Sequence, residues 1–286
     1  MERHYRFAGV ELTVTMPEDL FYENEYHLKH FAVDTVTDPH VFSFRVADAL
    51  DPPGGDLLVQ MPGYRIYAAG GQRIRYIGSV SHSWEEGYIR AAHCGRMHHV
   101  QVKADAVAER IGVKTVLNSM GVEHLIARAG GFIFHCSCIE HQGKAILFTA
   151  PSETGKSTQA ELWKQYRDAA IVNGDRAAVR IVEGVPMADG IPFAGSSPYC
   201  EDRSLPIGAI VYLGQAPRTT IRRMRGYEAF ARIWEGVSVN TWDKTDVELV
   251  SGAVKRLVET VPVYHLPCTP DESAVITLEN ALKVSI

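Results

Sequence analysis

The chain has 286 residues, of which 46% are hydrophobic and 22% charged, as in an ordinary globular protein and unlike a disordered chain. A formal net charge of -5, from 29 Lys and Arg against 34 Asp and Glu, argues against a nucleic-acid partner. The five cysteines form no CxxC pair, so the sequence indicates neither a disulfide framework nor a zinc ribbon, and reduced thiols are expected.

The N-terminal segment leads into an alternating pattern and lacks the charged and then apolar character of a signal peptide. No apolar run approaches the ~20 residues that a membrane-spanning helix needs. We therefore expect a cytoplasmic protein without a membrane segment. The length allows one large domain or two smaller ones, and the pattern along the chain favours two.

Residues 1–103 contain short runs of alternating apolar and polar residues between Pro and Gly turns, which predicts a β-rich accessory domain. Within it, Gly70 and Gly71 precede the alternating residues 72–77 and predict a tight hairpin, because glycine supplies the positive φ that such turns need. Three histidines of this region lack carboxylates at fixed spacing and are interpreted as strand-surface residues and not as metal ligands: His93, His98 and His99.

From residue 104 the pattern becomes helical, and we place the start of a second domain, residues 104–286, at that point. Residues 132–139 and 144–148 are strand-like and predict an antiparallel hairpin. In a doubly wound fold the strand before a phosphate-binding loop lies among parallel strands. An antiparallel partner directly upstream therefore predicts a mixed sheet.

The segment from Ala150 to Thr158 follows this hairpin, precedes a helix-like run and matches a phosphate-binding loop of the Walker A type. In such a loop the backbone N–H groups surround the phosphates, an ammonium reaches the β and γ phosphates, and the next hydroxyl binds Mg²⁺. Lys156 and Ser157 match the last two roles. A helix beginning near Gly155 would add free N–H groups and the positive end of its dipole.

The loop departs from the strict pattern only where Ala150 replaces the first glycine, a change that costs little if φ is negative there. ATP or a related nucleotide with Mg²⁺ is the expected ligand. The expected nucleotide-binding residues are Ser152, Glu153, Thr154, Gly155, Lys156, Ser157 and Thr158.

Three features together resemble the HPr serine kinase/phosphorylase family: His-Cys-Ser-Cys at 135–138, the loop, and Val-Asn-Gly-Asp-Arg at 172–176. The P-loop core of that family is related to phosphoenolpyruvate carboxykinase. The resemblance covers the part of the chain after residue 115. It implies an α/β fold with a mixed sheet, in which a P-loop kinase core of the HPr-kinase/carboxykinase type follows the N-terminal accessory domain.

By position, the resemblance implies that Lys156 bridges the β and γ phosphates and that Ser157 binds Mg²⁺. Asp175 matches the second acid of the family's Asp pair and would both bind the metal and orient or deprotonate the attacking hydroxyl. Gly174 stands where the first acid would be, so one carboxylate would have to perform both tasks.

Two further catalytic roles follow from the same resemblance. His135 matches a histidine that faces the phosphates from the neighbouring strand, and Arg176 could stabilise charge on the transferred phosphoryl group. Each assignment has a structural alternative. Asp175 could cap a turn, His135 could be a buried histidine bonded to backbone, and Arg176 could form a surface ion pair.

The polar loop at residues 193–204 lies where these kinases place a mobile segment that faces the substrate, and it yields Glu201 and Arg203 as expected substrate contacts. An ordinary connection between strands fits the same composition.

The predicted activity is ATP-dependent, Mg²⁺-assisted phosphorylation of a hydroxyl, with serine expected, on a peptide, a small protein or a free amino acid. The alternative is a nucleotide-binding sensor or scaffold without phosphotransfer, which Gly174 favours; a carboxykinase-like or phosphatase reaction comes third. The sequence decides neither the acceptor nor ATP against GTP, and it leaves a homo-oligomer open.

Overall fold

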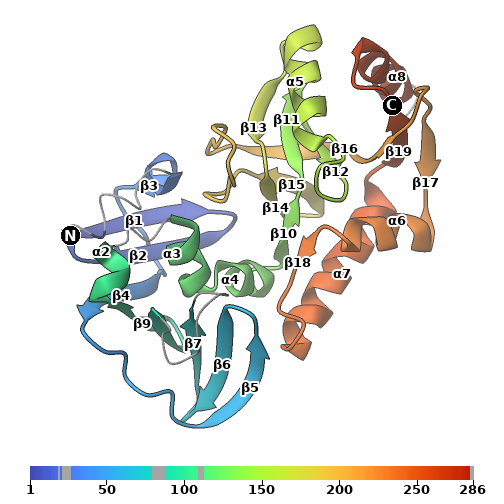
Figure 1. The fold of residues 1–286 in the computed structure, drawn as a ribbon. Coiled ribbons are helices and arrows are strands. Elements are labelled where there is room, and N and C mark those ends of the chain that lie inside the picture. Colours follow the sequence, from blue (N-terminus) through green and yellow to red (C-terminus); the bar gives the residue numbers. More distant parts are fainter. Residues whose placement is uncertain (19, 21–26, 79–87, 109–112, 284–286) are drawn as a thin grey trace. The chain divides into compact units, whose positions relative to one another are not determined.

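The structure, a computed structural model, describes residues 1–18, 20, 27–78, 88–108 and 113–283 (Figure 1). The chain divides into two compact units, Met1–Val122 and Glu123–Ile286. The sequence pattern suggested a boundary after Lys103, whereas the structure assigns α2 (Ala104–Ala108) and α3 (Val113–Met120) to the first unit. These two helices contact strands of the first unit, β9 and β8 respectively, and therefore belong with them.

The first unit is β-rich, as its alternating sequence predicts. Among its described residues, nine strands form one sheet in the order β3-β1-β2-β4-β9-β8-β7-β6-β5, with the short η1 helix (Lys29–Phe31) before β3. The strands are β1 (Glu2–Phe7), β2 (Val10–Thr15), β3 (Ala32–Val33), β4 (His40–Ala47), β5 (Asp56–Met61), β6 (Tyr64–Ala69), β7 (Gln72–Ile77), β8 (Ile89–Cys94) and β9 (Met97–Lys103).

The predicted hairpin at Gly70 and Gly71 is confirmed, because these glycines join β6 to β7 with φ values of 56° and 80°. The interpretation of the three histidines as strand-surface residues is wrong for His98. Its side chain is buried, stacks on Phe42 with ring centroids 4.1 Å apart, and lies 3.0 Å from His40 Nδ1. A neutral imidazole can be both donor and acceptor, so it can occupy such an interior position.

The second unit contains a mixed sheet, as the antiparallel hairpin before the loop predicts. Among the described residues its strands run in the order β13-β11-β12-β16-β15-β14-β10-β18, and β19 pairs with both β16 and β17. The strands are β10 (Gly131–His135), β11 (Ser137–His141), β12 (Lys144–Thr149), β13 (Ala170–Asn173), β14 (Arg176–Val182), β15 (Val185–Asp189), β16 (Ser204–Gln215), β17 (Arg222–Met224), β18 (Val237–Ser238) and β19 (Val263–Cys268). Strands β12, β16 and β19 are mutually parallel neighbours, whereas β11 is antiparallel to β12.

The predicted strand over residues 132–139 is two strands separated by Cys136. β10 pairs with β14 and β18, and β11 pairs with β12 and β13, so the chain leaves one set of partners for another at this residue. The Cys136 N–H donates to the Asp175 carbonyl oxygen at 3.0 Å, which holds the crossing point next to the turn between β13 and β14.

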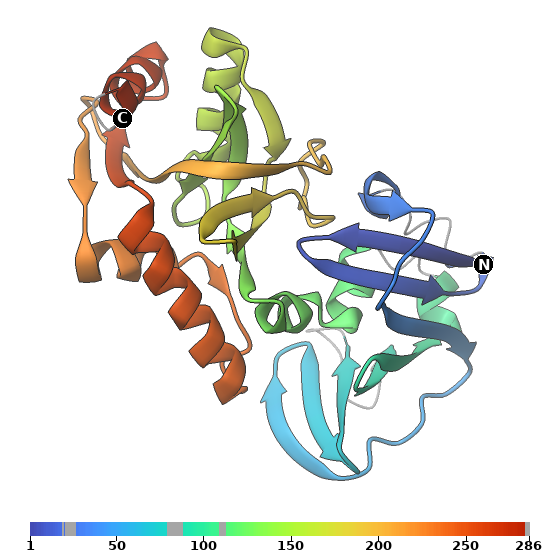
Figure 2. The same cartoon turned by 180° about the vertical axis from the view of Figure 1, so that it is seen from behind.

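Helices cover both faces of this sheet (Figures 1 and 2). They are α5 (Lys156–Arg167), α6 (Gly226–Trp234), α7 (Lys244–Thr260) and α8 (Glu272–Lys283), whereas α4 (Val122–Arg128) precedes β10. Helices α5 and α8 pack over one apolar cluster, which includes the fully buried Trp163, and α6 and α7 pack over a second cluster, which includes Phe134 and Leu257. The sheet is apolar on both faces, as expected for strands between two helical layers.

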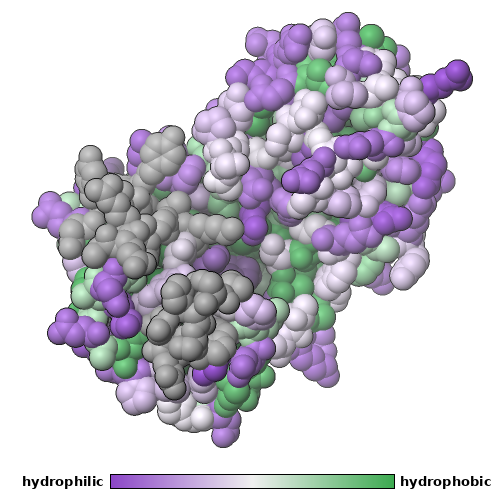
Figure 3. Space-filling view, in the orientation of Figure 1, coloured by the Kyte–Doolittle hydropathy of each residue, from purple (hydrophilic) through white to green (hydrophobic). Residues whose placement is uncertain are grey.

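Polar residues cover most of the surface of the second unit on the face shown in Figure 3, with apolar residues in small groups between them. None of the helices in the described ranges combines the length and apolar character needed to cross a membrane.

Candidate functional site

The predicted phosphate-binding loop connects the end of β12 to the start of α5. Gly155 directly precedes the helix with φ 116°, a conformation that favours glycine. Ala150 is not among the residues with positive φ, which explains why alanine is tolerated at the first position. Among the described residues no side chain caps α5, and Gln159 N–H donates to the Gly155 carbonyl at 2.9 Å. The N–H groups of residues 156–158 therefore precede the helical ladder and are available to an anion.

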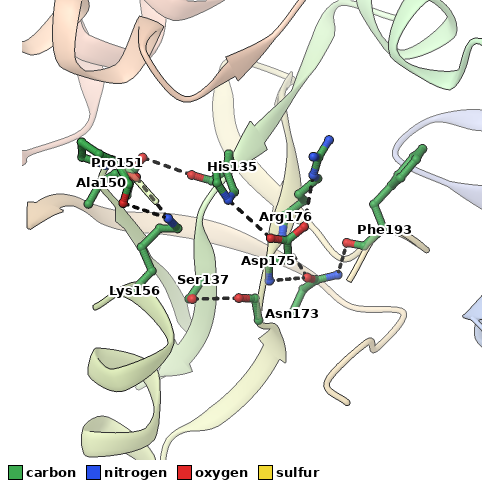
Figure 4. A network of polar contacts seen from close by, with 11 residues as sticks. His135, Ser137, Ala150, Pro151, Lys156, Asn173, Asp175, Arg176 and Phe193 are labelled. Carbon is green, nitrogen blue, oxygen red and sulfur yellow. Dashed lines mark hydrogen bonds and ion pairs between the residues drawn. The ribbon is translucent and has the colours of Figure 1, made fainter. Parts of the chain in front are cut away.

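Lys156 lies inside this loop, with 8% of its surface exposed. Its Nζ atom donates to the carbonyl oxygens of Ala150 at 3.1 Å and Pro151 at 3.4 Å (Figure 4). Burial lowers the pKa of the Lys156 ammonium, and the negative charge of Asp175 acts in the opposite direction. The Ser157 hydroxyl follows on the exposed side of the helix.

Asp175 and His135 are brought together by the ends of two strands. The His135 Nε2 atom lies 3.4 Å from Asp175 Oδ1, and Arg176 Nε donates to Asp175 Oδ2 at 3.2 Å. The hydrogen bond from His135, aided by the charge of Arg176, holds the pKa of the Asp175 carboxyl below its usual value against the effect of burial. At neutral pH this group is therefore a carboxylate.

Thr149 connects the loop strand to the same group of residues. Its hydroxyl donates to the His135 carbonyl oxygen at 3.1 Å, so the end of β12 is tied to the end of β10. The predicted catalytic residues Lys156, His135, Asp175 and Arg176 thus surround one region at the ends of β10, β12 and β14.

Asn173 was not singled out from the sequence, yet it organises the turn that carries Asp175. Its side chain is fully buried; Oδ1 accepts the backbone N–H groups of Asp175 and Arg176, both at 2.9 Å, and Nδ2 donates to the carbonyl oxygens of Ile191 and Phe193. The turn is therefore capped by Asn173, which leaves the Asp175 carboxylate free to face His135. The signal in the sequence was the Asn-Gly-Asp turn itself, because asparagine commonly bonds the backbone two residues ahead.

The position of Gly174 is covered by the loop at residues 194–199. A Cβ atom at position 174 would collide with Cβ and Oγ of Ser197, and one at Gly195 would lie 2.9 Å from Asp175 Cγ. Gly195 has φ 58°, which also favours glycine. A side chain at position 174 therefore has no room while the loop keeps this conformation.

The predicted substrate contacts lie in a different environment. Arg203 pairs with Glu140 of β11 at 2.5 Å and with Glu201 at 3.7 Å. Glu140 lies on β11 near the end of the strand that is remote from the phosphate-binding loop, whereas Ser137 lies at the end near that loop. The structure thus engages Glu201 and Arg203 in ion pairs, and their contact with a substrate stays a prediction.

The oxygen donors for a metal ion are those that Mg²⁺ prefers. Asp175 supplies a carboxylate with 28% of its side chain exposed, and Ser157 supplies an exposed hydroxyl. These residues fit a magnesium ion bound together with the phosphates of a nucleotide.

A second cluster of potential ligands, His124, Asp243 and Asp246, has ligand atoms within 4.8 Å of one another. Asp246 is buried and accepts hydrogen bonds from His124 at 2.8 Å and from Arg128 at 3.2 Å. Asp243 caps α7, and its Oδ1 accepts two backbone N–H groups. Arg128 contacts both carboxylates, and Asn240 also donates to Asp246, so we interpret the cluster as a polar network that fixes α4 to the start of α7.

Residues 102–282, more than half of the chain, match the sequence model of the family described as SynChlorMet cassette protein ScmC. The matched region contains every residue of the site described above. Among solved structures, the HPr(Ser) kinase/phosphatase from Coxiella burnetii is similar at 12% identity and a TM-score of 0.33, over 54% of this chain and 99% of that chain. At these values the likeness decides neither fold family nor activity. The search of curated proteins gave no match.

Proposed function

The chain belongs to the family of SynChlorMet cassette protein ScmC, and from the geometry of its loop we propose that it is an ATP-dependent, Mg²⁺-assisted kinase. The acceptor would be a hydroxyl, with serine expected, on a peptide, a small protein or a free amino acid. One observation carries the proposal: the Asp175 carboxylate, bonded to His135, faces the region of Lys156 at the uncapped start of α5 (Figure 4).

The phosphate end of the site would use the first turn of α5 and Lys156. The ammonium of Lys156 now bonds to two loop carbonyls and would exchange these for the oxygens of the β and γ phosphates. The Ser157 hydroxyl and the Asp175 carboxylate would hold Mg²⁺, which neutralises charge on the phosphates when bound.

The acceptor end would use Asp175. Because its pKa is held below the usual value, Asp175 is a weak base and would mainly orient the attacking hydroxyl. It would accept the hydroxyl proton late, as the new O–P bond forms and ADP leaves. His135 keeps the Asp175 carboxylate in position through the 3.4 Å contact between Nε2 and Oδ1. Arg176 would stabilise the negative charge on the transferred phosphoryl group. Catalysis of this kind depends mostly on positioning and electrostatics.

A second candidate function is nucleotide sensing without phosphotransfer. The packing of Ser197 against Gly174 favours it, because this contact leaves no room for a second acid at position 174. Asp175 is then the one carboxylate that the turn at residues 173–176 supplies. In this case the nucleotide would bind through the phosphate-binding loop, but its γ phosphate would be neither hydrolysed nor transferred.

The experiment that separates the two measures ATP binding with Mg²⁺ by calorimetry and transfer of label from γ-labelled ATP to free serine and serine peptides. We expect Lys156→Ala to abolish binding, Asp175→Asn to retain binding but lose transfer, and Lys255→Ala, an exposed lysine on α7, to change neither. Binding without transfer in the wild type would favour the sensor. Normal transfer by Lys156→Ala would refute the kinase proposal.

A further inference from the structure

A cavity of 640 Å³ lies beside the phosphate-binding loop in the second unit. Its walls include Thr158 and Gln159 of α5, residues 213–216 at the end of β16, and Cys268 at the end of β19. Strands β12, β16 and β19 are parallel, so their carboxyl ends meet at one edge of the sheet, where open α/β sheets bind ligands. Thr154 and Gly155 of the loop also line this cavity, which makes it continuous with the phosphate site.

The cavity fits a neutral ring better than a second anion. Among the described residues that line it, Glu153 is the one charged residue and is exposed, while Leu213 and Pro270 supply apolar surface. A purine ring requires apolar walls with a few polar groups at its edge.

Gln159 places an unused acceptor in this wall. Its side chain is buried, with 2% of the residue exposed, and its Nε2 atom donates to Cys268 Sγ at 3.3 Å. Its Oε1 atom is buried and accepts no hydrogen bond from the described residues. Buried acceptors are rarely left without a donor. Because Gln159 lines the cavity, a rotation of its amide would present this oxygen to a donor that enters there.

We propose that this cavity receives the base of the nucleoside triphosphate and that Gln159 selects adenine over guanine. The inference rests on the proposed phosphate site. The 6-amino group of adenine would donate to Gln159 Oε1, whereas guanine presents a carbonyl oxygen at the same position, and two acceptors would face each other. A site built to bond one donor discriminates strongly against a ligand that lacks it.

The test uses calorimetry with Mg²⁺ to compare three nucleotides that differ only at the base: ATP, GTP and purine riboside triphosphate, which lacks the 6-amino group. Inorganic tripolyphosphate, which has neither base nor ribose, reports on the phosphate site alone. For the wild type we expect ATP to bind at least about tenfold more tightly than GTP or purine riboside triphosphate. In Gln159→Met this preference should fall to within about threefold, with tripolyphosphate affinity unchanged. Gln165→Met, an exposed position on the same helix, should behave like the wild type.

Equal wild-type binding of ATP, GTP and purine riboside triphosphate overturns the proposal, and so does an unchanged ATP preference in Gln159→Met. A preference for GTP also overturns it, because that result requires the amide to present its nitrogen to the cavity. In each of these cases, binding of tripolyphosphate would show that the proposed phosphate site still holds although the base pocket does not. If the wild type binds none of the four, the proposed function fails together with this inference.

Discussion

The Oδ1 atom of Asn173 accepts the backbone N–H of Asp175 at 2.9 Å, so the residue that positions the candidate catalytic carboxylate lies two places before it in the chain. The same side chain donates to the carbonyl oxygens of Ile191 and Phe193. Asn173 therefore connects the turn carrying Asp175 to the start of the loop that covers it.

Replacing Asn173 by alanine should destabilise the protein by about 2–3 kcal/mol, because four hydrogen bonds are lost and the carbonyl oxygens of Ile191 and Phe193 stay buried. Urea unfolding measures the loss. An alanine variant as stable as the wild type would show that the turn does not depend on this side chain.

The stability contributed by Asp175 should depend on pH. Its folded pKa lies below the ordinary value of 3.8, so the contribution is fully present above that value and is lost as the pH falls through the folded pKa. Asp175→Asn should thus be less stable than the wild type at neutral pH, and the difference should shrink below pH 3.8. Urea unfolding of both proteins across pH 3–7 measures it, and a difference that grows on acidification would contradict the assignment.

The network at Asp246 should matter for stability and not for metal binding. Asp246→Ala leaves Arg128 and His124 without their shared buried partner, and we expect a loss of about 2–4 kcal/mol, less than for a fully buried pair because Arg128 is 44% exposed. Thermal unfolding with and without a chelator provides the second measurement. A drop in the wild-type melting temperature on adding a chelator, absent in Asp246→Ala, would show that the cluster binds a metal.

Features set by neighbouring residues could be predicted from the sequence, whereas features set by contacts between distant strands could not. The loop between Ala150 and Lys156 and the mixed sheet follow from local pattern, because loop geometry and hairpin pairing depend on neighbouring residues. The division of residues 132–139 at Cys136 does not, since it arises from pairing with β14 and β13, which are distant in sequence. The burial of His98 was missed for the same reason: its neighbours His40 and Phe42 come from another strand.

Contacts of the candidate site with residues far along the chain were also beyond local pattern. In the sequence, Gly174 is interpreted as the loss of an acid. In the structure, Ser197 packs directly against Gly174, so a side chain at this position would collide with it. In the sequence, Gln159 is simply one residue of a predicted helix. That its amide nitrogen bonds to Cys268 of β19 while its amide oxygen has no donor depends on a contact between residues distant in the chain.

The contact between Gly174 and Ser197 gives a prediction about restoring an acid at this position. Gly174→Asp should destabilise the protein by about 1–3 kcal/mol, because its Cβ would collide with the Ser197 side chain and displace the loop. Ser197→Gly removes the obstructing atoms, so the double variant should recover most of the loss, and the two changes should be non-additive in urea unfolding. Gly252→Asp, at a glycine of α7 that also lacks a positive φ and has open space around it, controls for the cost of replacing glycine by aspartate without a collision. If the double variant is no more stable than Gly174→Asp, the loop does not restrict position 174, and the reason for glycine there lies in the turn itself.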